Sequence, residues 1–199
     1  WADLSNIYVW TLIFVSLSLG GLGFLDDMLK IKFKNSSGLK SKYKFSGQMI
    51  IGVIALFILI NFSNHEFLYN LYFPFFKTLI LNLGLFFVPF ALFVLIGASN
   101  AVNLTDGLDG LATVPVMLVA LSFTLISYVV GNTIFSDYIQ IQYIPDVGEL
   151  SIFCGSIVGA CLGFLWYNAP PAKIFMGDTG SLSLGGSLAA IAIIVKHEI

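Results

Sequence analysis

Six long stretches without a charged residue divide this chain and decide what it can fold into. Each is close to the ~20 residues that a helix needs to cross about 30 Å of hydrocarbon. They cover residues 4–25, 45–65, 78–105, 111–136, 151–172 and 179–195. Because lipid offers the backbone no hydrogen bonds, only helices or closed barrels can span it. The stretches are continuously apolar rather than alternating, which favours helices.

The composition supports the same interpretation, because 58% of the 199 residues are hydrophobic and only 10% are charged. Soluble domains are much less apolar than this. We therefore predict an all-α, polytopic membrane protein with about six transmembrane helices and no soluble domain. The first stretch lacks a basic leader and a small-residue cleavage site, so it is not a signal peptide. Because the chain starts at Trp1 and ends shortly after its last span, we expect residues 1–199 to be one transmembrane domain truncated at both ends.

The distribution of lysine predicts which loops face the cytoplasm. All nine basic residues are Lys, and six of them lie between residues 30 and 44. By the positive-inside rule, this loop is cytoplasmic. Counting spans from there places residues 100–110 and 168–180 on the same face. We expect a short hairpin or re-entrant piece on the outer face within residues 63–83, with His65 there as a solvated or interfacial residue.

Charge and cysteine usage exclude some other functions. The net charge is −2 and the sequence has no basic patch, so nucleic acid is not an expected partner. Cys154 and Cys161 are seven residues apart in one span and therefore lie on one helix face. We interpret them as small packing residues, since the span offers no further metal ligands.

The most informative polar stretch is residues 100–110, which places two Asn and two Asp between long apolar runs. A carboxylate at the bilayer centre costs roughly 2.5 kcal/mol or more, so such residues usually serve a function. Asp106 and Asp109 are three apart and would share one face of a helix. Gly107 and Gly110 would let the backbone approach a ligand closely. We interpret this stretch as an active-site loop at the membrane surface.

Two further polar clusters should reach the same face. Each cluster alone has a simple explanation. Asp26-Asp27 is typical of a solvated span end. The run of lysines is typical of positive-inside signalling or of attraction to anionic lipid. Gly177-Asp178-Thr179-Gly180 alone is typical of a tight turn into a helix, and Phe175 alone of interfacial packing. Together on one face they favour a phosphate-rich substrate with a divalent cation. Magnesium takes carboxylate and phosphate oxygens and would polarise the transferring phosphorus, while lysines hold the remaining phosphate charge.

Three blocks of sequence resemble the polyprenyl-phosphate N-acetylhexosamine-1-phosphate transferase superfamily, and within it the phospho-N-acetylmuramoyl-pentapeptide transferase branch (translocase I). The resemblance covers essentially the whole chain, and its second and third blocks are highly specific. The blocks are Gly23-Phe24-Leu25-Asp26-Asp27, Asn100-Ala101-Val102-Asn103-Leu104-Thr105-Asp106-Gly107-Leu108-Asp109-Gly110-Leu111-Ala112 and Pro171-Ala172-Lys173-Ile174-Phe175-Met176-Gly177-Asp178-Thr179-Gly180-Ser181-Leu182.

The resemblance implies a magnesium-dependent enzyme of peptidoglycan synthesis, and so of cell wall biogenesis, cell shape and cell division. It would transfer phospho-MurNAc-pentapeptide from UDP-MurNAc-pentapeptide to undecaprenyl phosphate, giving lipid I and UMP. As a multi-pass protein of the bacterial inner membrane, it would have its active site facing the cytoplasm. Its partners would be the two substrates and the lipid bilayer, and a homodimer stays open.

The resemblance also implies roles for individual residues. Asp26, Asp27 and Asp178 would be catalytic, with Asp178 binding Mg²⁺ and the other two lying near the polyprenyl phosphate. Phe175 would stack on uracil. The substrate-binding set would be Lys30, Lys42, Asn103, Asp106, Asp109, Asn168, Phe175 and Gly177, with Lys30 the least firmly placed.

Two mechanisms remain open under this resemblance. In one, Asp26 or Asp27 deprotonates the lipid phosphate, which attacks the sugar-linked phosphorus directly; in the other, an aspartate attacks first and carries the phospho-sugar covalently. We favour direct attack. Family members have more spans and a late cytoplasmic loop with a His-rich motif, so we expect these 199 residues alone to be inactive.

Three alternative functions compete with this one. Related transferases that use UDP-GlcNAc share the Asp-Asp and Asp-Gly features. An ion-coupled transporter would place its ionisable residues at the bilayer midplane, on broken helices in paired halves, and this chain has no matching halves. A CDP-alcohol phosphotransferase would carry an Arg after Asp-Gly, and this chain contains no Arg.

Overall fold

A computed structural model describes residues 2–34, 38–63, 68–73 and 76–199, so the prediction for His65 lies outside the described residues. Within these residues, six helices are long and apolar enough to cross a membrane, which confirms the predicted all-α, multi-pass architecture. They are α1 (Ile7–Phe33), α2 (Ser41–Phe62), α3 (Phe87–Thr105), α4 (Thr113–Val130), α6 (Leu150–Asn168) and α7 (Gly177–Ile194).

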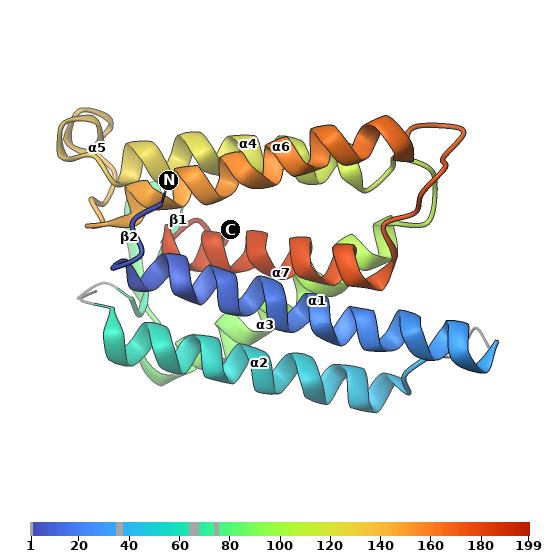
Figure 1. The fold of residues 1–199 in the computed structure, drawn as a ribbon. Coiled ribbons are helices and arrows are strands. Elements are labelled where there is room, and N and C mark those ends of the chain that lie inside the picture. The colour runs from blue at the N-terminus through green and yellow to red at the C-terminus, as the bar shows by residue number, and fades with distance from the viewer. Residues whose placement is uncertain (1, 35–37, 64–67, 74–75) are drawn as a thin grey trace.

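The short elements gather at one end of the bundle, together with both chain ends (Figure 1). β1 (Asn70–Phe73) and β2 (Phe76–Asn82) form an antiparallel hairpin, as expected for this segment. Two 3-10 turns precede α3 and α6, at Gly84–Phe86 and Val147–Glu149. The short helix α5 (Thr133–Ile139) was not anticipated; the Asn132 side chain caps it by accepting bonds from the N–H groups of Ile134 and Phe135.

Helix α7 forms the centre of the fold and packs between α1 and α3 (Figure 1). Two-thirds of its span is buried (67%), against at most 39% for any other span. Small residues allow this close approach. A side chain at Gly185 would meet the Ala98 backbone, and Ser183 Oγ lies 2.9 Å from Ser16 Oγ of α1. Helices α4 and α6 pack on each other as a separate pair.

Two helices extend into the polar blocks. α1 continues through the charged residues to Phe33, where Lys34 ends it in a left-handed conformation. Asp26 and Lys30 are four apart and form an ion pair that supports this extension. α3 continues to Thr105, so the first half of the stretch that we interpreted as a loop is helical. As a result, all three polar blocks lie at helix ends on one side of the bundle, opposite the β-hairpin (Figure 1).

Candidate active site

Three carboxylates from two helices meet at this end of the bundle. Asp26 and Asp27 come from α1 and Asp178 from the first turn of α7, and ligand oxygens of the three lie within 4.8 Å of one another. Asp26 is almost fully buried, at 3% exposure. The two helices touch here because Gly23 has no side chain; a Cβ on it would overlap the backbone carbonyl of Asp178.

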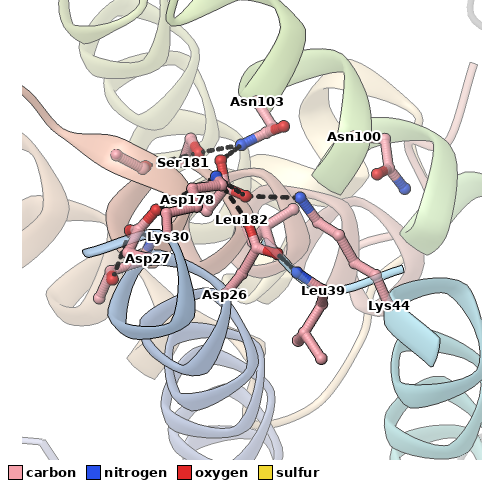
Figure 2. Close-up of polar contacts among 12 residues, drawn as sticks. Asp26, Asp27, Lys30, Leu39, Lys44, Asn100, Asn103, Asp178, Ser181 and Leu182 are labelled. Atoms are coloured by element: carbon pink, nitrogen blue, oxygen red, sulfur yellow. Dashed lines mark hydrogen bonds and ion pairs between the residues drawn. The ribbon is translucent and has the colours of Figure 1, made fainter. Parts of the chain in front are cut away.

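Lys30 lies at the centre of this acidic cluster (Figure 2). Its Nζ is 2.6 Å from Asp26 Oδ2, 3.0 Å from Asp178 Oδ2 and 3.4 Å from Asp27 Oδ1. One ammonium group therefore contacts all three carboxylates. It stands where these side chains would also hold a divalent cation.

Asp178 has two further partners from other helices. Lys44 reaches it from α2, with Nζ 2.7 Å from the same Oδ2 that Lys30 contacts (Figure 2). Asn103 of α3 donates from Nδ2 to Asp178 Oδ1 at 2.6 Å and to Ser181 Oγ at 2.8 Å. Four transmembrane helices are thus tied together at a single carboxylate.

Backbone groups orient the other two carboxylates. Asp26 Oδ1 accepts a bond from the Leu39 N–H at 2.6 Å. Asp27 Oδ2 accepts from both the N–H and the Oγ1 of Thr179, each at 3.0 Å. Gly177 adopts φ +65°, and a Cβ there would come within 2.8 Å of Asp27 Oδ2. A glycine is therefore required for α7 to begin this close to α1.

Asp106 lies beside the cluster without joining its ion pairs. Burial raises its pKa, the nearby Asp178 and Asp27 raise it further, and the backbone N–H of Gly177 opposes the shift. Its position at the end of α3 places it next to the start of α7. Asp106 thus adds negative charge to the rim of the site.

Asp109 and Asn168 hold the loop that leads into α7. Asp109 Oδ2 accepts a bond from the Ala172 N–H at 2.9 Å. Asn168 is buried; its Oδ1 accepts from Thr113 Oγ1 at 2.7 Å and its Nδ2 donates to the Ile174 carbonyl at 3.0 Å. In the structure, both side chains shape the loop at 169–176. Phe175, on that loop, is 69% exposed and presents its ring to the surroundings.

The residues of the cluster differ in part from those expected. Lys30 and Asn103 join it as expected. Lys42 is exposed on α2, and Lys44 makes the contact with Asp178 in its place. Residues two apart on a helix point to nearly opposite sides. The buried face of α2 contains Gln48, Gly52 and Leu56, and extending that face back by one turn leads to Lys44. The periodicity of α2 could therefore have identified Lys44.

The donor set of the cluster fits a hard divalent cation. Three carboxylates face two lysines, which leaves one negative charge in excess, and oxygen is the ligand that Mg²⁺ prefers. Asp26, Asp27 and Asp178 are the residues that could hold such an ion. Phosphates of a substrate could then pair with the lysines that the ion displaces.

Comparison with known proteins shows the family to which this chain belongs. The sequence model for glycosyl transferase family 4 matches residues 9–196. A phospho-N-acetylmuramoyl-pentapeptide-transferase of Pelagibacter ubique (strain HTCC1062) is 63% identical over all 199 residues. The alignment covers 55% of that protein, so the chain spans about half the length of the curated relative it matches. The chain belongs to glycosyl transferase family 4.

Proposed function

We propose that the full-length protein transfers phospho-MurNAc-pentapeptide from UDP-MurNAc-pentapeptide to undecaprenyl phosphate. The products are lipid I and UMP, and the reaction belongs to peptidoglycan synthesis. The observation that carries this proposal is the cluster of Asp26, Asp27 and Asp178 around Lys30 at one end of a membrane bundle. The name of the 63% identical relative supports the choice of substrates.

Magnesium is the cofactor that this site suits best. Asp178 would hold it, and Asp26 and Asp27 would complete the carboxylate set. When bound, the ion neutralises diphosphate charge and polarises the phosphorus that is transferred. Lys30 lies on the same carboxylates and would bind phosphate oxygens once the ion takes its place.

Asp27 is better placed than Asp26 to accept a proton from the lipid phosphate. Asp26 is 3% exposed, and both its oxygens are engaged, by the Leu39 N–H and by Lys30. Asp27 keeps 27% of its side chain exposed, and its Oδ1 has a weak contact with Lys30 at 3.4 Å. The deprotonated lipid phosphate oxygen attacks the sugar-linked phosphorus, the phosphorus–oxygen bond to UMP breaks, and UMP leaves with the electron pair.

The remaining residues place the nucleotide. The exposed Phe175 ring offers a flat surface for uracil, and Asn168 and Asp109 hold its loop through buried and backbone contacts. Lys42 extends the basic surface around the site, while Asn103, Asp106 and Gly177 line the acidic cluster. The six lysines between residues 30 and 44 support, by the positive-inside rule, a cytoplasmic position for this end of the bundle in a bacterial inner membrane.

Release of UMP by the full-length protein in lipid nanodiscs tests this proposal. We expect UMP from UDP-MurNAc-pentapeptide only when undecaprenyl phosphate and Mg²⁺ are both present. UDP-GlcNAc in place of the muramoyl substrate is the control for the related transferases. Faster turnover with UDP-GlcNAc would contradict the substrate, and UMP release without any lipid phosphate would contradict the reaction.

A further inference from the structure

Thr179 directs two hydrogen-bond donors at the same carboxylate oxygen. Its backbone N–H and its Oγ1 each lie 3.0 Å from Asp27 Oδ2. Asp27 belongs to α1 and Thr179 to the first turn of α7, so both bonds cross from one helix to the other. Two donors on one residue restrict the orientation of a carboxylate more than a single donor does. Thr179 therefore fixes the position of Asp27 Oδ2.

The other oxygen of this carboxylate, Oδ1, is held far less firmly. Within the described residues, its contact is with Lys30 Nζ at 3.4 Å. Asp27 is also the most exposed of the three carboxylates, with 27% of its side chain exposed against 4% for Asp26 and 14% for Asp178. Thr179 thus engages one oxygen of Asp27 and leaves the other one to meet a substrate.

The packing of α1 against α7 does not depend on the Thr179 hydroxyl. Ser183 lies one turn further along the same face of α7, and its Oγ donates to the Ser16 carbonyl of α1 at 2.9 Å. Gly20 of α1 lies between these contacts, where a Cβ would be 3.5 Å from Ser183 Cβ and 3.7 Å from the Thr179 carbonyl oxygen. The two helices should therefore stay in place when the Thr179 hydroxyl is removed.

We propose that Thr179 is a positioning residue: its hydroxyl holds the Asp27 carboxylate so that Oδ1 meets the proton of the lipid phosphate. The inference rests on the proposed function, in which Asp27 accepts that proton. Thr179 acts through Asp27 and does not itself contact the reacting atoms. Because a displacement of about 1 Å at a reacting group can lower the rate about a hundredfold, one orienting bond can affect turnover more than stability.

Turnover by full-length Thr179→Val in nanodiscs tests this role. Valine keeps the branched shape and the backbone N–H, so only the hydroxyl bond to Asp27 is lost. We expect kcat for UMP release to fall about tenfold or more, with both KM values within about twofold of wild type. The Tm should stay unchanged. Thr179→Ser keeps the hydroxyl and should recover most of kcat.

Two other hydroxyl deletions serve as controls. Thr124→Val removes an Oγ1 that donates to the Ala120 carbonyl of its own helix at 2.9 Å, and it should leave kcat unchanged. Ser183→Ala removes the bond to α1 one turn along and should lower the Tm while leaving kcat of the folded protein unchanged. An unchanged kcat in Thr179→Val would overturn the proposal. A higher KM with unchanged kcat, or no recovery in Thr179→Ser, would also overturn it.

Chemical labelling distinguishes failure of this inference from failure of the proposed function. Carbodiimide labelling of carboxylates, read by mass spectrometry without substrates, should modify Asp27 about threefold faster in Thr179→Val, as for the loss of one hydrogen bond. Asp137, exposed on α5, is the internal reference and should react equally in both proteins. If wild type releases no UMP but Asp27 labelling rises, the proposed function fails and the positioning of Asp27 stands. If wild type releases UMP and Thr179→Val matches it in kcat and labelling, only the Thr179 inference fails.

Discussion

Oppositely charged side chains gather at both ends of α7, but in different arrangements. At its start, Asp178 joins Asp26 and Asp27 around Lys30, with Lys44 as a second cation. Just beyond its end, Lys196 pairs with Glu198 at 2.5 Å; the two side chains are 2% and 0% exposed. Lys196 also donates to the Leu68 carbonyl at 3.0 Å, and its Nζ lies 4.6 Å from the centre of the Phe87 ring.

This difference indicates which end of α7 can take part in a reaction. The pair at Lys196 is balanced in charge and closed to solvent. Burial lowers the pKa of Lys196 and raises that of Glu198, and their attraction opposes both shifts. The cluster at Asp178 has one carboxylate in excess, is partly open, and draws its charges from separate helices. An unbalanced, accessible cluster can accept a cation, whereas a closed and balanced pair has no charge left to bind one.

The largest expected effect is on turnover, from Asp178→Asn in the full-length protein. The change keeps the shape of the side chain but removes the charge that two lysines and Asn103 contact. We expect Mg²⁺-dependent UMP release to fall by about a thousandfold or more, as for the loss of a main electrostatic contribution to the transition state. Asp137→Asn, on the exposed surface of α5, is the control. Near-normal rates at saturating substrates would contradict the role of Asp178.

Lys196→Met should instead affect stability and leave turnover of the folded protein unchanged. It leaves the carboxylate of Glu198 buried without its partner, which costs about 3–5 kcal/mol. Thermal unfolding in detergent measures this loss. The double variant Lys196→Met/Glu198→Gln should recover most of it, because no unpaired charge remains. A large loss of kcat with normal stability would remove the distinction between the two ends.

Asn168→Ala should affect both stability and nucleotide binding. It removes the bonds to Thr113 and to the Ile174 carbonyl, and we expect a cost of about 1–3 kcal/mol. Because the loop that it holds carries Phe175, the KM for the nucleotide sugar should rise as well. Asn132→Ala removes the cap of α5 at the other end of the bundle and should lower stability by about 1 kcal/mol. An equal rise in the KM for the nucleotide sugar in Asn132→Ala would contradict this difference between the two ends of the bundle.

The smallest effect concerns pH. Burial and the neighbouring Asp178 and Asp27 raise the pKa of Asp106, so its charged form is disfavoured in the folded state. This cost is present above the folded pKa and disappears as the pH falls below the unfolded value. In cation-free buffer, Asp106→Asn should therefore raise Tm by about 1 °C at pH 8, and the gain should shrink on acidification. A lower Tm for the variant at pH 8 would show that the ionised Asp106 stabilises the fold.

Much of the fold follows from local patterns in the sequence. The uncharged runs predict the six spans, and the position of the lysines predicts which ends lie together. The ion pair of Asp26 with Lys30, four residues on, supports the extension of α1, and apolar periodicity does not register it. The cap at Asn132 is a local signal for α5 that could have been used.

The rest depends on tertiary packing. Lys42 and Lys44 are equivalent in composition, and only the buried face of α2 shows which one reaches Asp178. The Asn168–Thr113 bond joins residues 55 apart in the sequence, and no spacing rule predicts it. In the sequence, Lys196 and Glu198 are typical of an ordinary polar span end. Only the structure shows that Lys196 contacts the Phe87 ring of α3 and the Leu68 carbonyl. Such contacts form only when segments distant in the sequence pack together, so local patterns do not predict them.

Mn²⁺ binding to the full-length protein without substrates, followed by electron paramagnetic resonance, tests the central claim most directly. Mn²⁺ takes the same octahedral oxygen sites as Mg²⁺. If Asp26, Asp27 and Asp178 hold one cation, wild type binds a single Mn²⁺ per chain, and Asp178→Asn and Asp27→Asn each weaken that binding strongly. Wild-type stoichiometry and affinity in Asp178→Asn would contradict the account.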